Sequence, residues 1–139
     1  MNDVYYMNLA LKEAKKAYRK GEIPVGAIIV ENNVVIAKGH NLRDSKKNVL
    51  KHAEMIAIEK ANKKKKDWRL NECIIYITLE PCNMCKGAIE QARIKKVIYG
   101  VKSKTEHNME VLISKIENET LTNECALLLN ECFKSIRDK

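Results

Sequence analysis

Four residues in two short motifs have the types and spacing of a catalytic metal site. Cys82 and Cys85 are separated by two residues and follow Pro81, and His52 lies about thirty residues earlier, two residues before Glu54. Two thiolates and an imidazole suit Zn²⁺, and three protein ligands leave its fourth tetrahedral position open for water. An open position indicates catalysis. We therefore interpret Glu54 as the general acid/base that handles the protons of the water, not as a fourth ligand.

Each motif is weak evidence by itself. C-x-x-C also occurs in redox dithiols and in closed structural zinc sites, and H-x-E is less specific still. A closed site needs a fourth ligand, but His40 and His107 fall in expected loops, where we expect surface side chains. Both motifs are expected to begin helices, and this shared context favours a catalytic zinc site over buried thiols and a buried histidine.

The elements that must position these residues can be read from hydrophobic periodicity and turn residues. Helices are expected over 3–20, 52–64 and 121–137, with a further helix opening after Pro81, and strands over 26–31, 34–39, 73–79 and 96–101. The first two strands flank Asn32-Asn33, which is close to a hairpin signal, so they should pair antiparallel. The dense apolar run 73–79 suits a central strand buried on both faces. Alternating strands and helices predict a sheet with helices on both faces.

The position of each motif on its helix restricts where the site can lie. Side chains two apart on a helix point in nearly opposite directions, so His52 and Glu54 can share a site only at the N-terminal end of their helix. Pro81 suits the opening of the next helix, which places Cys82 and Cys85 one turn apart at a helix N-terminus. The helix dipole there favours thiolate over thiol.

Composition describes one folded domain, 1–139, that is not a membrane protein. The chain has 139 residues, 45% of them hydrophobic and 32% charged. No apolar run approaches the roughly twenty residues of a membrane helix, and the N-terminal segment lacks the layout of a signal peptide. Five cysteines in such a chain argue against a disulfide framework. We expect a cytoplasmic location, with Cys73, Cys125 and Cys132 as small core residues.

A formal net charge of +8 permits binding to a polyanion such as RNA. Lysines and arginines cluster at 12–20, 46–51, 63–66 and 93–96. Basic helix faces are also commonly only solvated, so charge alone leaves both interpretations open.

The combination of H-x-E with P-C-x-x-C resembles the zinc-dependent cytidine/adenosine deaminase superfamily. The segments 22–27, 52–55 and 78–82 look most like those of the bacterial tRNA adenosine deaminases, and the resemblance covers about 5–101 and 122–137. It implies a three-layer α/β/α sandwich with a mixed sheet of four to five strands, and hydrolytic conversion of the wobble adenosine of tRNA to inosine. It also implies a homodimer that binds the tRNA anticodon stem-loop.

The resemblance further implies a set of substrate contacts. Asn41 matches an asparagine that contacts the substrate, although a turn residue that ends a strand reads equally well from the sequence alone. Ile23, Pro24 and Val25 look like one wall of the base pocket, and Leu79 with Glu80 looks like the other. The implied metal ligands are again His52, Cys82 and Cys85, with Glu54 as the catalytic residue.

The chain departs from the family pattern after residue 101. An acidic residue of the family aligns with Ser103, and the segment 102–108, which in the family helps to hold the RNA loop, is about ten residues short. A parallel crossover needs about a dozen residues or more. Residues 109–116 are therefore expected either to form a helix with no fifth strand or to form a strand that turns back antiparallel, and we favour the strand.

This departure leaves three functions to compare. The first is deamination of adenosine in tRNA. The second is deamination of free bases or nucleosides such as cytosine, cytidine or guanine, for which the basic surface would be incidental. The third, a zinc module that only binds RNA, is disfavoured by Glu54.

Overall fold

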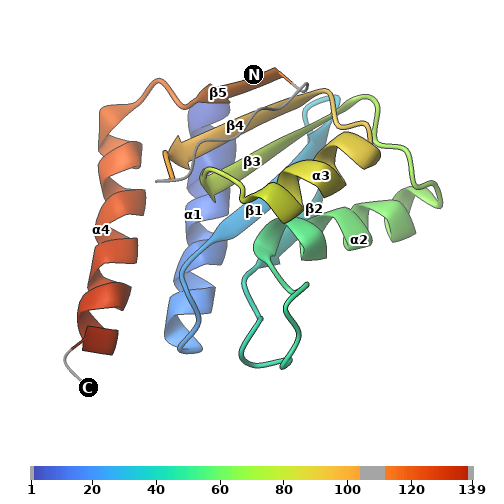
Figure 1. Ribbon diagram of the computed structural model, residues 1–139. Helices are drawn as coiled ribbons and strands as arrows, with labels where there is room; N and C mark the ends of the chain where they lie inside the picture. The colour runs from blue at the N-terminus through green and yellow to red at the C-terminus, as the bar shows by residue number, and fades with distance from the viewer. Residues whose placement is uncertain (1, 104–111, 138–139) are drawn as a thin grey trace.

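The computed structural model describes residues 2–103 and 112–137. The elements of this part follow the predicted order (Figure 1), and they are α1 (Asp3–Arg19), β1 (Gly26–Glu31), β2 (Val34–His40), α2 (Ala53–Lys65), β3 (Cys73–Leu79), α3 (Asn83–Gln91), β4 (Lys96–Val101), β5 (Leu112–Lys115) and α4 (Glu119–Arg137). The expected helices and strands are confirmed to within a few residues at their ends.

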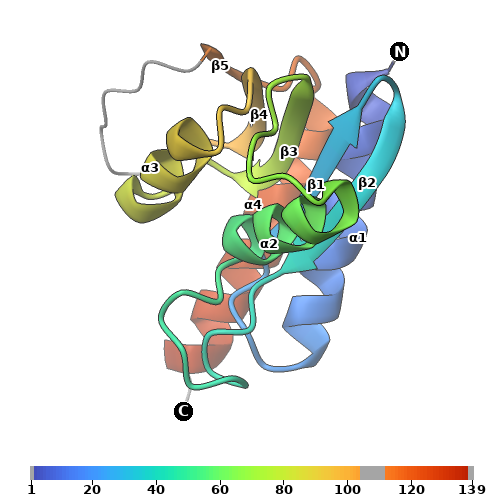
Figure 2. The ribbon, with the colours of Figure 1, turned by 90° about the vertical axis from the view of Figure 1, so that its right-hand side faces the viewer.

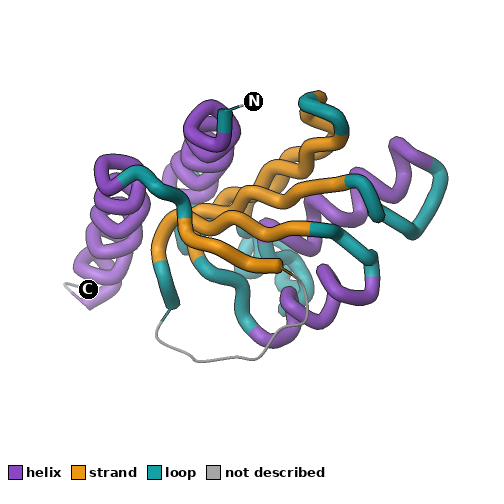
Figure 3. The backbone as a smooth tube through the Cα atoms, turned by 90° about the horizontal axis from the view of Figure 1, so that it is seen from above, coloured by secondary structure: helices purple, strands orange, loops and turns teal. Residues whose placement is uncertain are grey.

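The strands form one mixed sheet in the order β2-β1-β3-β4-β5, with β3 at its centre as predicted. β1 pairs antiparallel with both β2 and β3, whereas β3, β4 and β5 are parallel to one another. Helices α1 and α4 cover one face of the sheet and α2 and α3 the other, as Figures 1 and 3 show. The predicted three-layer α/β/α sandwich is confirmed.

The β1–β2 hairpin turns at Asn32 and Asn33, as the sequence predicts. Their φ angles are +48° and +64°. Two consecutive positive φ angles are typical of the type I′ turn, whose twist matches that of the flanking strands, and asparagine tolerates this conformation.

The direction of β5 differs from both expectations for residues 109–116. Of these, 112–115 form the favoured strand, but the strand runs parallel to β4, with Leu112 opposite Lys96 and Lys115 opposite Tyr99. Residues 109–111 lie outside the described part. The dozen or more residues of our expectation describe the usual crossover, which contains a helix. Ten residues separate β4 from β5, and at about 3.3 Å per residue an extended chain of that length exceeds the six-residue strand β4, so the connection is long enough for a parallel strand.

Helix α2 lies unusually close to the sheet because small residues face each other there. Ala53, Ala57 and Ala61 are fully buried in the core under α2 and α3. A methyl group added to Gly39 of β2 would lie 2.4 Å from the backbone oxygen of Ala53. The sheet thereby fixes the first turn of α2, which carries part of the predicted site.

The three cysteines outside the motif are free, buried thiols, as predicted. Burial raises the pKa of Cys73 to about 11 and that of Cys125 to about 12, and it also raises the pKa of Cys132. A thiol is nucleophilic only as thiolate, so these three are inert near neutral pH. Within the described residues, no helix is long and apolar enough to cross a membrane.

Candidate metal centre and active site

The three predicted ligands meet at the N-termini of two helices. His52 is the N-cap of α2, Cys82 is the N-cap of α3, and Cys85 lies in the first turn of α3. Both helices lie on the same side of the sheet (Figure 2). His52 Nδ1 is 3.8 Å from Cys82 Sγ and 3.6 Å from Cys85 Sγ. The three ligand atoms lie within 4.8 Å of one another.

These distances fit a zinc ion. With a Zn–S distance of about 2.3 Å and a Zn–N distance of about 2.05 Å, a tetrahedral angle places nitrogen and sulfur about 3.6 Å apart. The two measured N–S separations, 3.6 and 3.8 Å, lie close to this value. Burial, with a smaller effect of the Arg43 charge, lowers the pKa of His52 and so favours the neutral imidazole, which is the form that binds metals.

Glu54 lies in the first turn of α2, beside the ligands. It is 3% exposed, and this burial raises the pKa of Glu54 to about 7, although hydrogen bonds from its own backbone N–H and from the Cys85 thiol act in the opposite direction. A cation held by the three ligands would lower this pKa again by favouring the carboxylate. The position suits a group that takes up and returns a proton. The expectation that His52 and Glu54 share the N-terminal end of one helix is confirmed.

A pocket of about 230 Å³ opens over these residues. Its walls come from the segment before β1, the loop after β2, the first turn of α2 and the segments after β3 and β4. The lining residues are Ile23, Val25, Asn41, Arg43, His52, Ala53, Glu54, Leu79, Glu80, Cys82 and Ser103. All but one of the predicted substrate contacts are thus brought together. The exception is Pro24, whose side chain is fully buried and does not line the pocket.

Asn41 is held rigidly at the pocket. Its side-chain oxygen accepts a hydrogen bond from Arg43 N at 3.2 Å, and its amide nitrogen lies 3.4 Å from the backbone oxygen of Ile23. Asn41 thus forms the turn after β2 and also lines the pocket, and its contact with the substrate stays a prediction. The neighbouring His40 is not in a loop, because it ends β2, and its Nδ1 lies 3.1 Å from Glu13 Oε1. His107 lies outside the described residues.

Sequence reasoning missed two lining residues, Arg43 and Ser103. Arg43 belongs to the polar segment that precedes His52, which Figure 2 shows as a long loop beneath α2. The buried carboxylate of Glu22 holds this loop, accepting hydrogen bonds from Asp44 N at 3.1 Å and from the Ser45 backbone N–H at 2.6 Å and its hydroxyl group. The sequence signal that could have revealed this loop contact was Glu22, a charged residue directly before the apolar segment Ile23 to Val25.

Ser103 and Glu80 meet at the opposite wall. Glu80 Oε1 accepts hydrogen bonds from both the backbone N–H and the hydroxyl of Ser103 at 3.2 Å, and Lys86 Nζ lies 3.5 Å from Glu80 Oε2. Lys86 is 4% exposed, and the side chain of Glu80, its ion-pair partner, is nearly as buried. The acidic residue of the family at position 103 is thus replaced by a hydroxyl group that bonds to Glu80, which directly follows the neighbouring strand β3.

Comparison with known proteins agrees with the fold and the ligand set. Residues 1–101 match the family described as the cytidine and deoxycytidylate deaminase zinc-binding region. The chain belongs to this deaminase family. It is accordingly a zinc-dependent hydrolytic deaminase, with His52, Cys82 and Cys85 positioned to hold the metal ion.

Individual relatives and solved structures show which deaminases the chain is similar to. The chain is 38% identical over 153 aligned positions to the tRNA-specific adenosine deaminase of Bacillus subtilis (strain 168), covering 99% of this chain and 92% of the relative. A solved structure from work on A-to-I editing by tRNA:A34 deaminases superimposes with a TM-score of 0.83 at 30% identity, covering 91% of this chain and 99% of that one. The guanine deaminase of Bacillus subtilis gives a TM-score of 0.70 at 28% identity, covering 100% and 96%.

Proposed function

We propose that this protein deaminates adenosine to inosine at the wobble position of tRNA. The observation that carries the proposal is the 38% identity, over almost the full chain, to a tRNA-specific adenosine deaminase. The pocket supports it, since its apolar walls and buried carboxylate suit a flat base whose exocyclic amine is replaced. A net charge of +8 suits an RNA substrate.

His52, Cys82 and Cys85 would hold the zinc ion. When bound, Zn²⁺ supplies a positive charge that lowers the pKa of water and so makes it a better nucleophile near neutral pH. Glu54 carries the protons of the reaction. Its carboxylate takes one from the attacking water and gives it to the ring nitrogen next to the reacting carbon. It then takes the second from the new hydroxyl group and gives it to the amine, as the carbon–oxygen double bond forms and the carbon–nitrogen bond breaks. The balance is water added at that carbon and ammonia released.

The pocket walls orient the base for this proton transfer. Ile23 and Val25 on one side and Leu79 on the other would enclose its two faces. The fixed amide of Asn41 and the carboxylate of Glu80 would contact its polar groups or the sugar. Because both are held by neighbouring hydrogen bonds, they lose little freedom when the substrate binds.

The protein acts in the cytoplasm, as a homodimer, on the anticodon stem-loop. The substrate supports the location, and the family resemblance supports the dimer. Light scattering at several protein concentrations tests the dimer directly, and a mass equal to one chain at all concentrations would contradict it.

A substrate panel with ammonia release as the readout tests the function. The panel contains a tRNA transcript with adenosine at the wobble position, its anticodon stem-loop, free adenosine, cytidine, cytosine and guanine. We expect release only from the two RNAs, together with inosine in the product. The alternative is deamination of free guanine, for which the structural similarity to a guanine deaminase is the specific observation. Turnover of guanine but not of RNA would establish that alternative.

A further inference from the structure

The surface at the far end of α2 carries an exposed tryptophan with two arginines near its ring. Trp68 is 52% exposed. The guanidinium carbons of Arg69 and Arg93 lie 5.2 and 5.1 Å from the centre of its ring. An aromatic face attracts such cations, and stacking holds the planar guanidinium in one orientation. Together with Lys64 and Lys66, these three residues are here called the Trp68 cluster.

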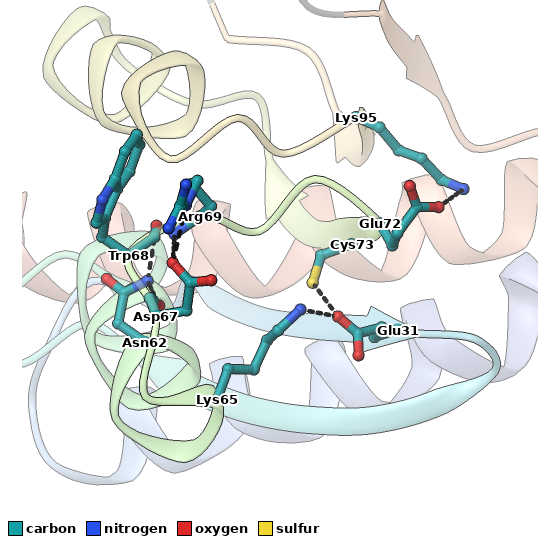
Figure 4. Close-up of polar contacts among 9 residues, drawn as sticks. All are labelled: Glu31, Asn62, Lys65, Asp67, Trp68, Arg69, Glu72, Cys73 and Lys95. Atoms are coloured by element: carbon teal, nitrogen blue, oxygen red, sulfur yellow. Dashed lines mark hydrogen bonds and ion pairs between the residues drawn. The ribbon is translucent and has the colours of Figure 1, made fainter.

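The cluster is built on a rigid base. Asn62 Nδ2 donates to the backbone oxygens of Asp67 and Trp68 at 3.1 and 3.0 Å. Figure 4 shows these two contacts with the Trp68 ring directed away from Asn62. Asp67 Oδ1 in turn accepts from the backbone N–H and from Nε of Arg69, at 3.0 and 3.1 Å. The chain segment that carries the ring is therefore fixed before any partner binds.

Arg93 reaches the same surface from the other helix. Leu70 N donates to the backbone oxygen of Ala92 at 2.8 Å, which joins the segment after α2 to the end of α3. Arg93 then adopts a left-handed conformation, with φ of +63°, which is uncommon for a residue with a side chain. This turn and the buried Leu70 place the Arg93 guanidinium against the Trp68 ring.

The charge of the cluster is only partly compensated. Among the described residues, Asp67 pairs with Arg69 and Glu59 pairs with Lys63, whereas Lys64, Lys66 and Arg93 form no ion pair. Fixed guanidinium groups bind phosphate in a defined geometry, and neighbouring ammonium groups add attraction that depends on salt. Of the possible partners, a phosphodiester backbone matches this charge.

The distance between the cluster and the pocket determines which substrates can contact both. His52 and the cluster are at opposite ends of α2, whose 13 residues span about 20 Å. A nucleotide bound in the pocket therefore has its own phosphates out of reach of Trp68. Only an RNA that continues well beyond the reacting nucleotide can contact both places.

We infer that the Trp68 cluster is a second RNA contact, which binds the sugar-phosphate backbone of the tRNA outside the anticodon loop. This inference rests on the proposed function. The contact is independent of sequence, and it acts on the affinity for long RNA and not on the chemical step, because no residue of the cluster lines the pocket.

The test compares a full-length tRNA transcript with an anticodon hairpin whose stem has only two base pairs. Inosine formation is measured for the wild type, Trp68→Ala, Arg93→Ala, Arg93→Lys and Lys12→Ala. Lys12 is the matched control, since it is an exposed cation on α1, on the opposite face of the sheet, and its loss changes the net charge equally.

We expect Arg93→Ala and Trp68→Ala to raise KM for the full-length tRNA about tenfold, leave kcat unchanged, and leave both constants for the hairpin within about twofold of the wild type. Arg93→Ala also reduces the salt slope of tRNA binding by about 1. Arg93→Lys retains part of the affinity, and Lys12→Ala behaves like the wild type.

Three outcomes would overturn the inference. In the first, both cluster variants have the same KM for full-length tRNA as Lys12→Ala. In the second, the cluster variants raise KM for the hairpin as much as KM for the full-length tRNA. In the third, light scattering shows that Trp68→Ala changes the oligomeric state, which would assign the cluster to a contact between copies of the chain. Absence of inosine with the wild-type protein would instead reject the proposed function, so the two failures are distinct.

Discussion

The Nδ1 atom of His52 lies 3.6 Å from the Sγ atom of Cys85, although the two residues are 33 positions apart in the sequence. They meet because α2 and α3 begin at the same end of the sheet, on the same face. The Cys85 thiol already donates a hydrogen bond to the Glu54 carboxylate across these first turns. A metal ion held by His52, Cys82 and Cys85 would tie the two helix ends together more strongly.

Removal of the metal should lower stability as well as activity. A ligand at a hundred times its Kd stabilises the folded state by about 2.7 kcal/mol, which corresponds to roughly 10 °C in Tm for a chain of this size. We expect a loss of that order, with complete loss of deamination, after chelation or in His52→Ala. Zinc content and calorimetry provide the measurement. Cys132→Ala, which removes a buried thiol outside the site, should keep its zinc.

Glu54→Gln should abolish turnover without loss of metal. The amide cannot carry the proton, so kcat should fall by about 10²- to 10⁴-fold. In the metal-free protein, where the carboxyl group is buried and its pKa is raised to about 7, its replacement by a neutral group should leave the free energy of unfolding unchanged or higher. The control is Glu59→Gln, an exposed position on the same helix. Near-normal turnover of zinc-loaded Glu54→Gln would show that Glu54 is not the acid/base.

Gly39→Ala should weaken the metal site, although Gly39 is not part of it. The added methyl group would lie 2.4 Å from Ala53 O and 2.9 Å from Ala57 N, so α2 must move away from β2. We expect a loss of about 1–3 kcal/mol in the free energy of unfolding, with weaker zinc binding because His52 moves with the helix. Gly87→Ala is the matched control. Nothing lies within 4 Å of its added methyl group, and a helical alanine should stabilise the protein by about 0.5–1 kcal/mol. Equal unfolding curves for the two variants would refute the steric argument.

Glu22→Gln should change the acid stability of the loop that carries Arg43. Burial alone would raise the pKa of Glu22, but hydrogen bonds from the hydroxyl and N–H of Ser45 and from Asp44 N outweigh it and hold the pKa below the usual 4.5. A carboxylate with a lowered pKa contributes stability that is present above its unfolded pKa and is lost as the pH falls through its folded pKa. We therefore expect the wild type to exceed the variant by about 1–3 kcal/mol near pH 7 and the difference to shrink below pH 4.5.

Denaturant titrations from pH 3 to pH 7 measure this difference, and a gap that does not depend on pH would argue against the ionised carboxylate. Activity gives a second readout. Because the Glu22 carboxylate holds the loop that carries Arg43 and does not itself line the pocket, its loss should raise KM more than it lowers kcat.

Local sequence was sufficient for the elements and for the metal ligands. Asn32-Asn33 specifies its own turn, and Pro81 with Cys82 marks the start of α3. These signals depend on neighbours in the chain, on backbone preference and on side-chain period, so they can be read without the fold. The H-x-E and C-x-x-C spacings are similarly local, because each fixes two side chains on one helix end.

The tertiary structure decided what depends on contacts between distant segments. The sequence by itself determined a zinc site, a buried strand beneath it and a chain with excess positive charge. It did not determine that β5 runs parallel to β4, that Pro24 is buried away from the pocket, or that Arg43 and Ser103 line the pocket. Each of these follows from packing across the sheet, where a side chain is placed by residues tens of positions away. The ligands could be predicted because two thiols and an imidazole at expected helix starts suit Zn²⁺, whereas the rest of the pocket required the fold.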